Sequence, residues 1–174
     1  MIDNLVSATP ANGAKVVARA WVDPEFKRRL LTDATAATRE LGMGGVIPFG
    51  LTAVENTDRL HHLIVGTLDS AGYPRQLLGP PPTWYKSLEY RARAVSEPRA
   101  VLREFGMDLP DDTEVRVLDG VAHDRYLVVP RRPKGTERLT EDELARLVTR
   151  DSMIGVGEAR SPGGYAVAGP DGRA

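Results

Sequence analysis

Cysteine is absent from the 174 residues of this chain. Without cysteine there is no disulfide framework, no thiolate ligand for a metal and no cysteine nucleophile. An excess of positive charge is also missing, since 23 Lys and Arg face 24 Asp and Glu for a formal net charge of −1. Proteins that bind nucleic acids carry a basic patch or stripe, so we expect no nucleic acid among the partners.

Long apolar runs and a secretory signal are missing as well. No run approaches the roughly 18–20 apolar residues that a membrane-spanning helix needs. The opening sequence Met1-Ile2-Asp3-Asn4 lacks the basic and apolar regions of a signal peptide. We therefore expect no membrane among the partners and a cytoplasmic location. The 41% of hydrophobic residues is enough to build a core in a single domain of this length.

The first quarter of the chain is predicted to be helical. Apolar residues recur at helical spacing from Val16 to Trp21. Asp23 is a residue type that caps helices, and Pro24 suits the first helical position because its missing N–H is not needed there. These two residues predict a second helix, which the apolar pattern extends toward Gly42.

The rest of the chain alternates short strands with helices. Ser96-Glu97-Pro98 begins a predicted helix that Gly106 ends, and Thr140 and Glu143 have the spacing of a capping box. Four short strands are predicted, the last two joined as a hairpin through residues 119–124: 51–55, 60–65, 114–118 and 126–129. The fold class is therefore α+β, with helices at both ends of a compact β core.

One long segment, from Gly66 to Pro82, follows neither a helical nor a strand period. Loops of this length in a compact domain are usually functional or disordered. Asp69 is its only carboxylate, and Tyr73 and Arg75 follow closely. A buried carboxylate beside an arginine could act as an acid–base or orienting pair, whereas an ordinary loop aspartate would make an Asx turn.

The three histidines do not favour a metal site. His61 and His62 lie next to each other in a predicted strand, so their imidazoles face opposite sides. His123 falls in the predicted hairpin loop, and no carboxylate has a suitable spacing. We interpret them as packing or surface residues and expect no metal.

Several long motifs resemble the nitrile hydratase alpha subunit. The resemblance extends in order over roughly residues 13–156, and the related thiocyanate hydrolases share this subunit type. The most specific motifs are these: 13–26, Val54-Glu55-Asn56-Thr57, 81–87 and Tyr90-Arg91-Ala92-Arg93.

The resemblance implies an architecture and a partner. It implies an N-terminal helical arm over residues 1–42, a layered α/β core over 43–156 and a flexible tail over 157–174. In the family the alpha subunit wraps around a beta subunit, so the resemblance implies a beta-like partner in a heterodimer or heterotetramer. Trp21 and Phe26 are among the apolar residues of the implied arm.

The family's alpha subunit holds an iron or cobalt in a claw of the form Cys-Thr-Leu-Cys-Ser-Cys. The matching residues here are Gly66-Thr67-Leu68-Asp69-Ser70-Ala71, and Gly72 is a one-residue insertion after them. All three sulfur positions are lost, and one carboxylate does not replace three soft thiolates. We therefore expect neither the family's metal nor another cofactor.

We interpret the chain as a metal-free enzyme acting with a beta-like subunit. Asp69 would be the general acid or base, and Ser70, Tyr73 and Arg75 would orient the substrate or bind an oxyanion. The reaction would be a cyclisation, dehydration or addition on a small polar substrate, of the kind found in specialised metabolism. Two alternatives stay open: a non-catalytic subunit that stabilises or regulates its beta-like partner, and a peptide precursor cleaved after Gly163-Gly164.

Overall fold

The computed structural model describes residues 10–43, 50–67 and 71–163. Within these ranges no helix has the length and apolar character to cross a bilayer. In chain order the helices and strands are as follows: α2 (Ala11–Val22), α3 (Pro24–Thr32), α4 (Ala34–Arg39), β1 (Leu51–Glu55), β2 (Leu60–Gly66), α5 (Arg75–Leu78), a 3-10 turn η1 (Thr83–Lys86), α6 (Leu88–Ser96), α7 (Pro98–Glu104), β3 (Glu114–Gly120), β4 (Arg125–Val129), α8 (Glu141–Ala145) and α9 (Arg150–Ile154).

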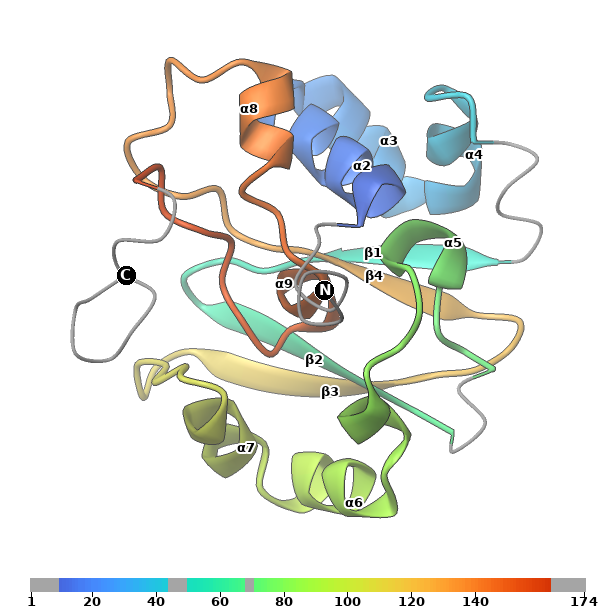
Figure 1. The fold of residues 1–174 in the computed structure, drawn as a ribbon, viewed down its shortest axis with the longest axis vertical. Coiled ribbons are helices and arrows are strands. Elements are labelled where there is room, and N and C mark those ends of the chain that lie inside the picture. The colour runs from blue at the N-terminus through green and yellow to red at the C-terminus, as the bar shows by residue number, and fades with distance from the viewer. Residues whose placement is uncertain (1–9, 44–49, 68–70, 164–174) are drawn as a thin grey trace, which may run out of the picture.

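Helices cover both sides of the strands (Figure 1). Helices α2, α3 and α4 pack beside β1 and β4, whereas α6 and α7 pack beside β2 and β3. The strands form two separate parallel pairs, β1 with β4 and β2 with β3. The α+β class predicted from the sequence is confirmed.

The predicted hairpin between residues 119 and 124 is wrong. Strands β3 and β4 belong to different sheets, and a single antiparallel bridge between Val121 and Asp124 turns the chain from one sheet to the other. Strand β2 is buried along almost its whole length, as parallel strands covered on both faces are. It pairs with β3 across the intervening helices, which a parallel connection needs.

The predicted helix start at Asp23 is confirmed. The Asp23 side chain accepts hydrogen bonds from the backbone N–H groups of Glu25 and Phe26, at 3.1 Å each. The helix does not reach Gly42, however, because Asp33 adopts an extended conformation and its side chain caps the next helix through the N–H of Ala36. Residues 10–43, the described part of the N-terminal region, thus contain three short helices rather than two.

The helix predicted from Pro98 to Gly106 and the capping box of Thr140 and Glu143 are confirmed. Helices α6 and α9 were not predicted. Both begin at a small hydroxyl residue whose oxygen accepts a backbone hydrogen bond, Ser87 for α6 and Thr149 for α9. In the long segment after β2, Leu77 and Leu78 are buried.

The N-terminal helices contribute to the core of this chain. Val16, Val17, Phe26 and Leu30 are at most 1% exposed, and α2 packs against α5 and α8. The division into an arm, a core and a tail stays a prediction.

Candidate functional site

Strands β2 and β3 end together, with Gly66 opposite Gly120 in the parallel register. The carboxyl ends of parallel strands are a common place for ligand sites. From Gly66 the chain returns to α5 through a segment that we call the β2 loop, residues 66–74. Two of the predicted site residues, Asp69 and Ser70, lie outside the described residues.

The space beside Gly66 is filled by an aromatic side chain. A Cβ atom placed on Gly66 would lie 2.6 Å from the hydroxyl oxygen of Tyr85, which is closer than carbon and oxygen pack without a bond. Tyr85 is only 1% exposed, and its ring packs edge-on against that of Tyr73, with 4.9 Å between ring centroids. A side chain at position 66 would therefore have to displace a buried ring.

The hydroxyl groups of Tyr73 and Tyr85 are buried without a hydrogen-bond partner among the described residues. Burial raises the pKa of both phenols well above the ordinary value, so both are neutral donors at physiological pH. Tyr90 differs, because its equally buried hydroxyl donates to the carbonyl oxygen of Ile64 at 2.8 Å. Unpartnered buried hydroxyls are rare and costly, which makes this tyrosine pair the most unusual feature of the site.

An ion pair between Arg91 and Asp119 contacts the first residue of the β2 loop. Arg91 donates one hydrogen bond to the carbonyl oxygen of Gly66 and another to the Asp119 carboxylate, both at 2.9 Å. The guanidinium holds the pKa of Asp119 below its ordinary value. Arg91 belongs to one of the motifs that carry the family resemblance. Nothing in the sequence predicted its contacts with Gly66 and Asp119.

The end of the loop is fixed by backbone contacts. A Cβ atom on Gly72 would lie 2.3 Å from the carbonyl carbon of Gly120, so only glycine allows this approach. Nearby, Arg125 donates from Nε to the carbonyl oxygen of Ala71 at 3.2 Å. Gly72 thus packs directly on the end of β3.

The predicted residues Tyr73 and Arg75 lie in different environments. Tyr73 is 2% exposed and belongs to the core, whereas Arg75 is exposed at the start of α5. The described residues alone do not bring the four predicted side chains together, and the assigned roles stay predictions.

The adjacent histidines are core residues. His61 Nε2 lies 2.6 Å from the carbonyl oxygen of Gly155, and His62 Nδ1 lies 3.0 Å from Oδ1 of Asn56. Burial lowers the pKa of both imidazoles, which favours their neutral forms. His123 is exposed. Over the described ranges no group of three or more His, Asp or Glu side chains could hold a metal ion.

A family model described as nitrile hydratase, alpha chain, matches residues 1–157. The chain belongs to the nitrile hydratase alpha family. The alpha subunit of the low-molecular-weight cobalt-containing nitrile hydratase of Rhodococcus rhodochrous is 56% identical over 88% of this chain and 73% of that subunit. The gamma subunit of the thiocyanate hydrolase of Thiobacillus thioparus is 43% identical over 84% of this chain and 65% of its own length.

Solved structures of the nitrile hydratase alpha family confirm the fold. A recombinant thiocyanate hydrolase with partially modified cobalt centres matches with a TM-score of 0.81 and 39% identity, over 87% of this chain and 75% of that chain. A double histidine-to-alanine mutant of the Fe-type nitrile hydratase of Comamonas testosteroni Ni1 matches with a TM-score of 0.79 and 41% identity, over 92% and 79%. The resemblance noted in the sequence is therefore confirmed.

Removal of the hydroxyl should change the free energy of unfolding in opposite directions at Tyr85, which has no hydrogen-bond partner among the described residues, and at Tyr90, which has one. Tyr85→Phe should leave the free energy of unfolding unchanged or raise it by up to ~1 kcal/mol, because an unpartnered polar group is removed. Tyr90→Phe, the matched control, should lower it by ~1–2 kcal/mol because the carbonyl of Ile64 loses its donor. Urea denaturation measures both, and equal losses would show that Tyr85 has a partner in solution.

Proposed function

We propose that this chain is an alpha-type subunit that has lost the family's cysteine-held metal and works with a beta-like partner. The sequence supplies no thiolate. Of the three positions that the resemblance assigns to cysteine, Gly66 and Ala71 have no side-chain donor atom. Only Asp69 offers a ligand, a carboxylate. A single hard carboxylate does not replace three soft sulfur ligands.

The observation that carries this proposal is the contact between Tyr85 and Gly66. The hydroxyl oxygen stands 2.6 Å from the place where a Cβ atom would be. This contact supports the proposal, because a side chain at the position that the resemblance gives as the first of the claw would have to displace the Tyr85 ring.

The chemistry that we propose for the β2 loop is metal-free acid–base catalysis. Asp69 is the proposed general acid or base, and a positioned group of this kind contributes about 10²–10⁴-fold to a rate. Ser70, Tyr73 and Arg75 are the proposed orienting or oxyanion-binding groups. The proposed substrate is a small polar molecule, and the proposed reaction is an addition, dehydration or cyclisation in the cytoplasm.

A second candidate is a non-catalytic subunit that stabilises or regulates its partner. The filled position beside Gly66 and the exposed side chain of Arg75 favour this alternative. On this account Asp69 only shapes a turn, and the reaction belongs to the partner.

An exposed apolar stripe supports the proposal of a partner subunit. Leu88 and Val95 on α6 are 66% and 59% exposed, and a spacing of seven residues places them on one face of the helix. The exposed Ala92 lies between them. A contiguous apolar surface of this kind is typical of a protein interface.

Metal analysis tests the loss of the metal. The chain is co-expressed with a beta-like partner in medium supplemented with cobalt and iron, and the purified complex is analysed by mass spectrometry of its metals. We expect far less than one metal per chain. A cysteine-containing relative prepared in the same way is the control, and stoichiometric metal in this complex would contradict the proposal.

Asp69→Asn separates the enzyme from the non-catalytic subunit. If Asp69 is the acid or base, turnover by the complex should fall by about 10²–10⁴-fold while the affinity for the partner is unchanged. Asp111→Asn, which changes an exposed carboxylate elsewhere, is the matched control and should leave turnover intact. Equal turnover by both variants would favour the non-catalytic subunit.

A further inference from the structure

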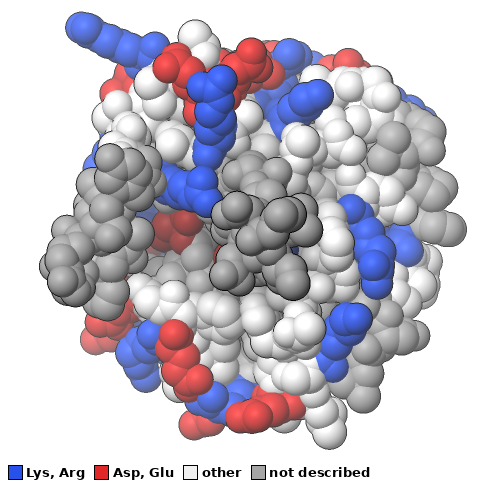
Figure 2. Space-filling model, in the orientation of Figure 1, with Lys and Arg blue, Asp and Glu red and all other residues white. Residues whose placement is uncertain are grey.

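A pocket lies at the opposite end of the strands from the β2 loop. It forms where β1 and β4 end and has a volume of about 790 Å³, which is within the range of small-molecule sites. Figure 2 shows it as a hollow with acidic and basic side chains at its rim and floor. We call it the β1–β4 pocket, defined by Trp21, Asn56, Arg131, Arg132 and Lys134 together with their neighbours.

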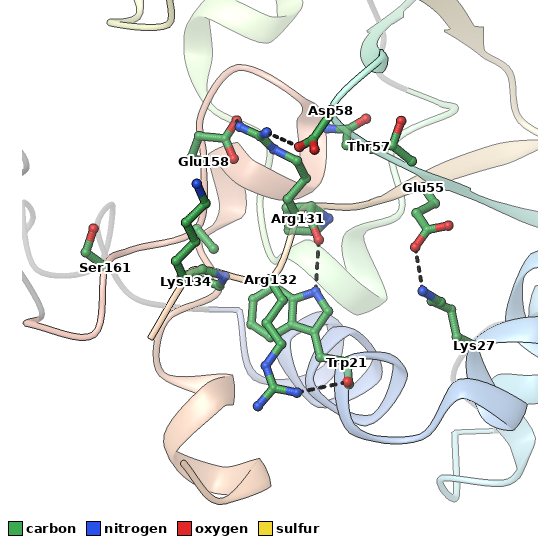
Figure 3. Close-up of a pocket in the computed structure, with 14 residues that line it drawn as sticks. Trp21, Lys27, Glu55, Thr57, Asp58, Arg131, Arg132, Lys134, Glu158 and Ser161 are labelled. Atoms are coloured by element: carbon green, nitrogen blue, oxygen red, sulfur yellow. Dashed lines mark hydrogen bonds and ion pairs between the residues drawn. The ribbon is translucent and has the colours of Figure 1, made fainter. Parts of the chain in front are cut away.

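Each carboxylate of the β1–β4 pocket contacts a cation. Lys27 Nζ lies 2.7 Å from Glu55 Oε2. Arg131 follows strand β4 and lies between Asp58 and Glu158 (Figure 3). It pairs with both carboxylates, at 2.8 and 3.2 Å. Four cations and three carboxylates line the pocket, which gives it a formal net charge of +1.

Two cations of the pocket, in contrast, have no carboxylate partner among the described residues. Arg132 donates to the carbonyl oxygens of Trp21 and Thr136, at 3.1 and 2.8 Å, and these neutral acceptors leave its charge without a carboxylate. Lys134 is exposed and makes no ion pair within the described ranges. Figure 3 shows Lys134 on the opposite side of the pocket from Lys27.

Asn56 adds a buried donor. Its side chain is buried, with 5% of the residue exposed, and Oδ1 accepts hydrogen bonds from N and Nδ1 of His62 at 2.8 and 3.0 Å. These two bonds fix the orientation of the Asn56 amide, and its nitrogen, Nδ2, takes no part in them. In the part of the chain that the structure describes, this nitrogen has no acceptor, and Asn56 lines the pocket.

An aromatic wall completes the β1–β4 pocket. Trp21 is held in place by the hydrogen bond from Nε1 to the carbonyl oxygen of Pro130, at 2.9 Å. Pro130, Pro133 and Ala159 add apolar surface beside the indole. The pocket thus combines a fixed aromatic surface with donors that lack an anion.

We propose that the β1–β4 pocket binds a small organic carboxylate with a flat apolar body. Lys134, Arg132 and the amide of Asn56 attract the carboxylate, and Trp21 contacts the body. This site is independent of the β2 loop and of the reaction proposed there.

Benzoate and benzamide are matched probes, because they share the flat ring and differ in charge. The full chain is used with Trp84→Phe, which leaves Trp21 as the only indole of the two in the sequence. We expect benzoate to quench Trp21 fluorescence saturably and to bind at least about fivefold more tightly than benzamide. No saturable quenching at millimolar benzoate, or equal affinity for both probes, would overturn the proposal.

Two variants test the donors. Lys134→Met should weaken benzoate binding about fivefold, whereas Lys15→Met, an exposed lysine outside the pocket, should not. Asn56→Asp keeps the acceptor for His62 but replaces the amide donor by a carboxylate oxygen, and it should abolish benzoate binding. An unchanged affinity in Lys134→Met would overturn the proposal even if Asn56→Asp does not fold.

Discussion

The structure of the β2 loop depends on close packing at two glycines. Tyr85 stands against Gly66 at the end of β2, and the backbone of Gly72 stands against Gly120 at the end of β3. A Cβ atom at either of these loop glycines would meet a neighbour at less than 3 Å, and Arg91 holds the carbonyl of Gly66 from the other side. The two contacts close the end of the β2–β3 sheet.

The two parallel pairs offer two different environments at their carboxyl ends. At the end of β2 and β3, neutral tyrosine hydroxyls are buried among aromatic rings and lack acceptors in the described residues. At the end of β1 and β4, charged side chains surround an open pocket. The first end holds the residues that the resemblance matches to the family's cysteine claw, and the chain has no cysteine. The second end has kept a cavity with donors, so we expect recognition of a charged small molecule there.

The start or end of a helix or strand was predictable where the chemistry of nearby residues determines it. Strand β1 was predicted with its true bounds, and Asp23 capped α3 as its side chain requires. The pairing of strands was not predictable, because β2 meets β3 across 54 positions of sequence, from Leu60 to Glu114, and no spacing rule links them. The motif around Tyr85 was visible in the sequence. Its contact with Gly66 was not, because it depends on how the turn η1 packs against β2.

The most direct test of the closed site is the stability of Gly66→Cys. This variant places a side chain against Tyr85 and introduces the only thiol of the chain, so the thiol can be titrated without background. We expect a loss of about 1–3 kcal/mol in the free energy of unfolding, of the order found for overpacked cores, and partial recovery when Tyr85→Phe is added. A Gly66→Cys variant as stable as the parent, with a thiol that reacts freely, would contradict this account.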